Sequence, residues 1–107
     1  FVDLMCGSGT IVIEASVWAR RNGVQDAQIF GYDADPEAIL RAQTNLSTAQ
    51  GLPPTKAAGP VALQASRYEL VEPPARPGVI VLNAPYGERL DSRPETVYRG
   101  LAQALHA

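Results

Sequence analysis

The feature that most constrains the fold is a run of consecutive apolar residues at 79–82, Val-Ile-Val-Leu, with polar and turn-forming residues directly after it. Such a run, without polar alternation, is typical of a strand buried on both faces of a parallel sheet. The run ends at Asn83, and ligands of parallel α/β sheets bind beyond the carboxyl ends of the strands. The sequence therefore predicts a parallel α/β sheet with a polar residue at one strand end.

The rest of the chain alternates between strand and helix patterns. Strands are predicted at 1–3, 28–32, 61–65 and 79–82, and helices at 10–21, 36–51 and from 92 onward. Asp35 and Pro36 form a helix start, and Trp18 is expected to lie on the buried face of the first helix. This order favours a mostly parallel sheet with helices on both faces.

The size and composition of the chain narrow its class. Its 107 residues make one small domain, and a net charge of -2 argues against an unaided grip on phosphate backbones. A single cysteine cannot form an internal disulfide, which fits a cytoplasmic protein. No apolar run approaches the ~20 residues that span a bilayer. Because the chain starts inside a strand and without Met, we expect a partial domain over 1–107, truncated at both ends and inactive alone.

A glycine-rich turn, Gly7-Ser8-Gly9, joins the first strand to the first helix. The dinucleotide fingerprint needs a third glycine where this chain has Val12, and the lysine of a phosphate-binding loop is missing as well. Asp3 stands at the mouth of the turn, where a carboxylate repels a pyrophosphate and attracts a cation. S-adenosylmethionine carries an ammonium and a sulfonium but no phosphate, so the turn favours this cofactor over NAD.

Two further residues near the turn invite a functional interpretation. Asp33 closes the second strand, where acids of nucleotide-binding folds accept the ribose hydroxyls. Helix capping is the alternative role for Asp33, but Asp35 is better placed to cap. Cys6 has no activating neighbour in the sequence and is expected to be a small packed residue rather than a nucleophile.

Three segments together resemble a known family. They are Asp-Leu-Met-Cys-Gly-Ser-Gly-Thr-Ile-Val-Ile-Glu-Ala from residue 3, Gly-Tyr-Asp-Ala-Asp-Pro from residue 31 and Asn-Ala-Pro-Tyr-Gly-Glu-Arg-Leu from residue 83. The chain resembles the amino-methylating Rossmann-like methyltransferases, and among them the THUMP-associated guanine-N2 methyltransferases of bacterial large-subunit ribosomal RNA. The resemblance runs over residues 1–107. It implies a partial Rossmann-like methyltransferase fold that contains the first four strands of the sheet.

The resemblance also implies roles for individual residues. The cofactor-binding residues would be Asp3, Cys6, Gly7, Gly9, Asp33, Ala34 and Ser66. The catalytic residues, which hold the base to be methylated, would be Asn83, Ala84, Pro85 and Tyr86. The chain departs from the family pattern at Leu4 and Ala84, where proline is usual, and at Ser66, where an aspartate usually bonds the adenine amino group. The change at Ser66 is expected to weaken donor binding.

The expected activity is therefore methyl transfer from S-adenosylmethionine to the exocyclic N2 amine of a guanine in large-subunit ribosomal RNA. No metal and no membrane are expected to take part, and contacts with the RNA are expected from further domains. The same strand-end motif also serves N6-adenine and protein-glutamine methylation, which remain alternatives. An inactive donor-binding fragment is a third possibility, consistent with Ser66 and Ala84.

Overall fold

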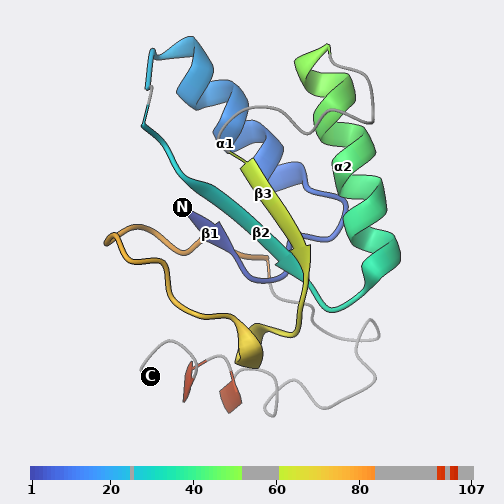
Figure 1. The fold of residues 1–107 in the computed structure, drawn as a ribbon, viewed down its shortest axis with the longest axis vertical. Helices are drawn as coiled ribbons and strands as arrows, with labels where there is room; N and C mark the ends of the chain where they lie inside the picture. Colours follow the sequence, from blue (N-terminus) through green and yellow to red (C-terminus); the bar gives the residue numbers. More distant parts are fainter. Residues whose placement is uncertain (25, 52–60, 84–98, 101, 104–107) are drawn as a thin grey trace.

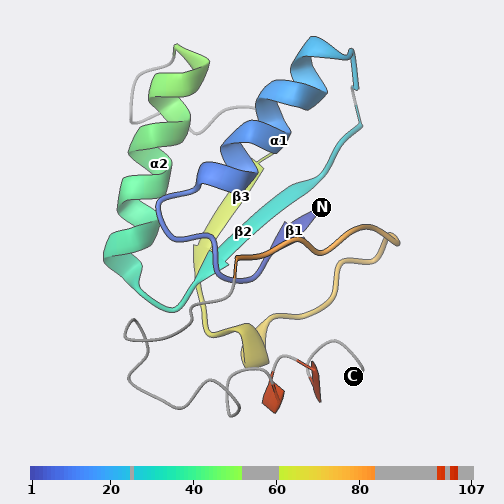
Figure 2. The ribbon, with the colours of Figure 1, turned by 180° about the vertical axis from the view of Figure 1, so that it is seen from behind.

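A computed structural model describes residues 1–107 except 25, 52–60, 84–98, 101 and 104–107. The described elements follow one another as β1 (Val2–Asp3), α1 (Thr10–Arg21), β2 (Ile29–Asp33), α2 (Pro36–Gln50), β3 (Val61–Ala65) and the short 3-10 helix η1 (Tyr68–Leu70). The strands form a parallel sheet in the order β1-β2-β3, and α1 and α2 lie together on one face of it (Figures 1 and 2). The predicted α/β class is confirmed for the described residues.

The ends of the helices follow from local chemistry. The Asp35 side chain accepts a hydrogen bond from the Glu37 backbone N–H at 3.0 Å, and Pro36 stands in the first turn of α2. This confirms Asp35 as the helix cap. The helix ends at Gly51, whose φ of 69° is a left-handed conformation that favours glycine.

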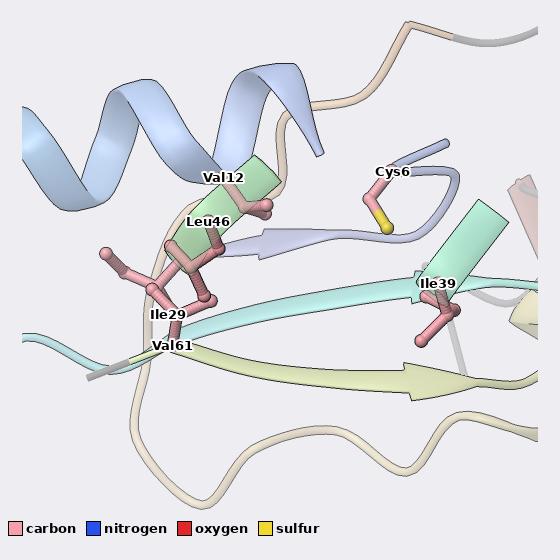
Figure 3. Close-up of a cluster of buried hydrophobic side chains, with 6 residues drawn as sticks. All are labelled: Cys6, Val12, Ile29, Ile39, Leu46 and Val61. Atoms are coloured by element: carbon pink, nitrogen blue, oxygen red, sulfur yellow. The ribbon is translucent and has the colours of Figure 1, made fainter. Parts of the chain in front are cut away.

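A hydrophobic core fills the space between the helices and the sheet (Figure 3). Its buried members come from both helices, from β2 and β3 and from the turn after β1: Cys6, Val12, Ile29, Ile39, Leu46 and Val61. Val12 and Leu46 are fully buried and anchor α1 and α2 respectively. The core thus fixes the position of both helices relative to the strands that they follow.

Close packing at Gly31 brings β2 near to α1. A Cβ atom at this position would lie 2.7 Å from Cδ2 of Leu63 and 3.3 Å from both Cys6 Sγ and Val12 Cγ1. A methyl group would therefore push on three side chains of the core at once. Glycine here lets the turn after β1 and the start of α1 lie directly against β2.

The opposite face of the sheet carries a second, less covered apolar cluster. Val2 and Leu4 are buried there, and Phe30, Tyr32 and Tyr68 pack against them half-buried. The rings of Phe30 and Tyr32 stack with centroids 6.5 Å apart, as expected for alternate residues on one face of a strand.

The segment 79–82 lies beside β1, on the side away from β2. Val2 and Ile80 form a parallel bridge, and the Val2 backbone is held by hydrogen bonds of 2.9 Å to the Val79 carbonyl and 3.0 Å from the Val81 N–H. The parallel placement beside β1 agrees with the sequence, but the predicted strand over 79–82 is not formed: the segment contributes only the isolated bridge at Ile80. The predicted burial on both faces is wrong, because Val79, Ile80 and Val81 are exposed and no described strand lies on their outer side.

The interpretation of Trp18 as a core residue is also wrong. This side chain is 62% exposed, whereas Val12, Ser16 and Ala19 are the buried residues of α1. The buried stripe is therefore displaced around the helix from the one that the apolar spacing predicts.

Two predicted segments fall mainly outside the described residues: the loop expected at 51–60 and the helix expected from 92. Of the second, four residues are described and are helical: Arg99, Gly100, Ala102 and Gln103.

Candidate functional site

The carboxyl ends of the strands meet at one edge of the sheet, which we call the rim: residues 3–9, 33–35, 66 and 83. In the register of the sheet Asp3 lies opposite Gly31 and Asp33 lies opposite Ala65. Ser66 follows β3 directly, and Asn83 follows the segment that pairs with β1. The chain moves outward from β1 to β3 and then returns to the other side of β1, so the rim contains a strand switch point.

Asp33 uses both carboxylate oxygens to hold the rim together. Oδ2 accepts a hydrogen bond from the Gly7 N–H and Oδ1 accepts one from the Asp35 N–H, each at 2.9 Å. Its carbonyl oxygen accepts a further bond from the Ser66 N–H at 2.8 Å. One residue thereby connects the glycine turn, the start of α2 and the end of β3.

Asp3 is almost fully buried, with 1% of its surface exposed. Its Oδ1 accepts a hydrogen bond from the Met5 N–H at 3.0 Å, which shapes the chain as it leaves β1. Burial raises the pKa of this carboxyl above its ordinary value; the bond from Met5 opposes the shift and the negative charge of Asp33 adds to it. The two acids are therefore close enough to interact electrostatically.

The glycine turn needs its glycines for conformation and for space. Gly7 and Gly9 have φ values of 54° and 90°, in the region that L side chains rarely adopt. A Cβ on Gly9 would also lie only 3.1 Å from the Cβ of Ala42 on α2. The turn is therefore pressed against α2 as it enters α1.

Two residues of α2 that take part in this arrangement were missed by the sequence analysis. Ala42 touches Gly9, and the side chain of Asn45 donates a hydrogen bond to the Ser8 carbonyl at 3.0 Å. The spacing of these two residues places them on the same face of a helix. The polar Asn45 on the same helix face as Ala42 was the sequence signal that could have indicated this contact.

Cys6 points into the core rather than toward the rim (Figure 3). Burial raises the pKa of its thiol to about 12, and the charges of Asp3 and Asp33 act in the same direction. The side chain is therefore a neutral thiol at physiological pH. Only the backbone of Cys6 is turned to the rim, where its N–H donates to the Tyr32 carbonyl and its carbonyl accepts from Gly9.

The remaining expected donor residues are less enclosed. Ala34 is exposed, and Ser66 is half-buried with its hydroxyl donating to the Arg67 carbonyl at 3.1 Å. Asn83 is exposed at the end of the segment beside β1. Ala84, Pro85 and Tyr86 lie outside the described residues.

A mainly apolar cavity of about 850 Å³ is lined by Leu4 but by no other described residue of the rim. It is bounded by α1 near Trp18, by the strands near Phe1 and Phe30, and by the segment 71–80. None of the expected donor residues lines this cavity. Its size therefore does not make it the candidate donor site.

Two features are absent from the described part of the chain. There, no three or more His, Cys, Asp or Glu side chains gather in a way that could hold a metal ion. Likewise, among the described helices none combines the length and the apolar character needed to cross a membrane.

Comparison with known proteins gives a consistent result. The sequence model of the RMKL-like methyltransferase domain matches residues 1–107. The ribosomal RNA large subunit methyltransferase K/L of Chromohalobacter salexigens is 30% identical over an alignment that covers 99% of this chain and 19% of that protein. The chain thus spans about a fifth of the length of this curated relative.

Solved structures show the same fold. SMU.472, a protein proposed to be a methyltransferase and solved in complex with SAH (S-adenosylhomocysteine), matches 99% of this chain with a TM-score of 0.70 and 26% identity. The match covers 36% of that protein. A protein of Listeria monocytogenes proposed to be an N6-adenine-specific DNA methylase matches 97% of this chain and 34% of its own, with a TM-score of 0.69 and 26% identity.

Proposed function

Because this chain belongs to the family of RMKL-like methyltransferase domains, we propose that its rim binds S-adenosylmethionine and serves the methylation of ribosomal RNA. The observation that carries the proposal is Asp33, whose carboxylate joins the glycine turn to the end of β2 and the start of α2. Ligands of parallel α/β folds bind at this edge of the sheet, beside the switch point. The match to a structure solved with S-adenosylhomocysteine supports the same assignment.

The charge of the rim favours this ligand over a nucleotide with phosphates. Asp3 and Asp33 place negative charge around the glycine turn, and the two are coupled closely enough for the charge of Asp33 to raise the pKa of Asp3. A pyrophosphate would be repelled here, whereas the ammonium and sulfonium of S-adenosylmethionine are attracted. When bound, this cofactor supplies a methyl group that its sulfonium has activated.

The rim residues fit the donor because they have free acceptor positions and open backbone at the edge of the sheet. Each carboxylate oxygen of Asp33 accepts one backbone N–H and retains a lone pair, so it can also accept a ribose hydroxyl. Gly7 and Gly9 have no side chains to obstruct the approach to the start of α1. Asp3 acts through its charge and through the chain direction that its bond to Met5 sets, because its surface is nearly inaccessible. Ala34 and Ser66 would border the adenine.

Asn83, at the end of the segment beside β1, would hold the amine that accepts the methyl group. Its side-chain oxygen and the carbonyl of Ala84 would accept the N–H groups of the amine, which localises the nitrogen lone pair. Tyr86 would stack on the base after it has been turned out of the RNA. An amide is not a base at physiological pH, so Asn83 contributes alignment and a fixed dipole rather than proton transfer.

We assign the substrate as the N2 amine of a guanine in large-subunit ribosomal RNA. We expect the reaction to take place in the cytoplasm. The resemblance of the motif from Asn83 to Leu90 supports the amine, and the name of the Chromohalobacter relative supports large-subunit ribosomal RNA as the class of substrate. Because the net charge is -2, we expect the contacts with the RNA phosphates to come from other parts of the natural protein. The alternative is N6-adenine methylation, which the name of the Listeria structure favours.

The test is a calorimetric titration followed by a transfer assay, both on the full-length natural protein that contains these residues. We expect S-adenosylmethionine and S-adenosylhomocysteine to bind and NAD not to bind. We then expect methyl transfer to unmodified large-subunit ribosomal RNA, but not to DNA or protein, with the label recovered as N2-methylguanine. Absence of donor binding would reject the whole proposal, while label on adenine would reject only the guanine assignment.

Replacement of Asn83 separates chemistry from donor binding. We expect Asn83→Ala to reduce turnover at least about a hundredfold, the scale seen when one preorganised dipole is removed, and to leave the donor Kd unchanged. Asn22→Ala is the matched control, because Asn22 is exposed at the end of α1 and, within the described part of the chain, its side-chain amide bonds only to the Trp18 carbonyl. Normal methyl transfer by Asn83→Ala would contradict the assigned role.

A further inference from the structure

Asn45 of α2 reaches across to the glycine turn, although the two are 37 residues apart in the sequence. Its side-chain Nδ2 donates a hydrogen bond to the Ser8 carbonyl at 3.0 Å. One turn earlier on the same helix, Ala42 packs against Gly9 so closely that a Cβ there would lie 3.1 Å from the Ala42 Cβ. The face of α2 formed by Ala42 and Asn45 therefore touches the turn and also bonds to it.

The hydrogen bond from Asn45 helps to fix the peptide plane between Ser8 and Gly9. In the plane between Ser8 and Gly9, the carbonyl accepts from Asn45 and the Gly9 N–H donates to the Cys6 carbonyl at 2.8 Å. Both polar groups of this plane are thus engaged, and it cannot rotate without breaking a bond.

A second plane of the turn, between Cys6 and Gly7, is fixed from the other side. Its carbonyl accepts from Gly9, and its N–H donates to Oδ2 of Asp33 at 2.9 Å. The turn is thus held by Asp33 at the end of β2 and by Asn45 on α2. A glycine-rich segment has many alternative conformations, and these two contacts reduce their number.

We propose that Asn45 is a positioning residue for the methyl donor: it holds the glycine turn in the conformation that accepts the ligand without itself touching that ligand. This inference rests on the proposed function of the rim. When the turn is already ordered, no part of the binding free energy is lost in ordering it. Loss of the bond should therefore weaken donor affinity while the reaction of the bound complex proceeds at its usual rate.

The test compares Asn45→Leu with the matched control Thr48→Val in the full-length natural protein. Leucine is close to asparagine in shape but cannot donate a hydrogen bond. Thr48 is exposed on the same helix, and among the described residues its hydroxyl bonds only to the Thr44 carbonyl within α2. Asn45→Ala is a second variant for the case that Asn45→Leu does not fold. Alanine also removes the hydrogen-bond donor, and it has the highest helix propensity.

We expect the Asn45 variants to bind S-adenosylhomocysteine about three- to tenfold more weakly, the effect of one hydrogen bond. Thr48→Val should bind as the wild type does. In turnover, KM for S-adenosylmethionine should rise by the same factor while kcat at saturating donor stays unchanged. Without ligand, hydrogen exchange of the Gly7 and Gly9 amides should be faster in the Asn45 variants alone.

The possible results separate this inference from the proposed function. Equal donor affinity in wild type and Asn45 variants would overturn the positioning role, as would an equal loss in Thr48→Val. A lower melting temperature with unchanged affinity would reduce Asn45 to a structural residue. A wild-type protein that does not bind S-adenosylhomocysteine would overturn the proposed function and with it the donor role of Asn45, even if the exchange rates still showed that Asn45 orders the turn.

Discussion

Asp33 already satisfies two backbone N–H groups before any ligand is considered. A carboxylate is suited to this position because it presents two acceptor oxygens and no donor. An asparagine would turn an NH₂ group toward either Gly7 or Asp35. These contacts give Asp33 a structural role, and the proposed bond to the donor ribose would add a functional one to the same carboxylate.

The first prediction follows from this double role. We expect Asp33→Asn to weaken S-adenosylhomocysteine binding by about tenfold or more, since a hydrogen bond to a charged group and the charge itself are both lost. The matched control is Asp26→Asn, which removes an exposed acid that pairs with Arg76. Calorimetry would measure both variants, and equal binding by wild type and Asp33→Asn would show that Asp33 only caps and connects.

Asp3 supports a second prediction, about stability and pH. Burial raises its pKa above the ordinary value of 3.8, so the folded chain binds the proton more readily than the unfolded chain. The stability linked to this proton is present below pH 3.8 and is lost as the pH rises through the folded pKa. Asp3→Asn mimics the neutral form, and its oxygen can still accept from Met5.

We therefore expect Asp3→Asn to raise the free energy of unfolding at pH 7, with the gain shrinking as the pH falls toward 3. Donor affinity should decrease at the same time, because a negative charge is lost from the rim. Urea denaturation at both pH values and one titration of S-adenosylhomocysteine would measure this. A variant less stable than wild type at pH 7 would show that the charge of Asp3 stabilises the fold.

At the scale of elements, the glycine turn is where fold and site depend on the same backbone. Gly9→Ala would combine a strained left-handed conformation with a contact of 3.1 Å to Ala42. Gly23→Ala is the matched control, since Gly23 also has a positive φ, of 67°, but a Cβ there meets open space. We expect Gly23→Ala to lose about 1–2 kcal/mol for the conformation alone.

The expected loss for Gly9→Ala is larger than that of Gly23→Ala, and donor binding should fall in this variant only. Chemical denaturation and titration of S-adenosylhomocysteine on both variants would measure the difference. Equal losses of stability, or normal binding by Gly9→Ala, would show that the contact between the turn and α2 is not important for the site.

Local sequence signals were sufficient for several elements. The bounds of α1 and β3 were predicted as observed, and the cap at Asp35 was identified, because each depends on neighbouring residues. Trp18 was misplaced because apolar spacing does not reveal which side of α1 meets the sheet. The burial of residues 79–82 was misjudged because an apolar run does not show which strands lie beside it.

The candidate site was predictable to a similar degree. Glycines and strand-end acids mark the rim in the sequence, so Asp3, Gly7, Gly9 and Asp33 could be located in advance. The inward orientation of Cys6 and the reach of Asn45 to Ser8 could not be, since both depend on how distant segments pack. Long-range contacts of this kind require the tertiary structure.

At the scale of the whole molecule, two surfaces differ in their properties. The rim gathers acids and a glycine turn at the carboxyl ends of the strands. The cavity of about 850 Å³ is mainly apolar, and of the described rim residues only Leu4 lines it. The central claim is that the donor binds at the polar rim, even though the apolar cavity is large enough for a small ligand.

Hydrogen exchange measured by mass spectrometry, with and without S-adenosylhomocysteine, tests this claim most directly. The full-length natural protein should show slower exchange in the presence of the ligand at residues 6–9 and 33–35. The segment 71–80 and the end of α1 near Trp18 should exchange as before. Protection confined to the segments that line the apolar cavity, with no change at the glycine turn, would contradict the account.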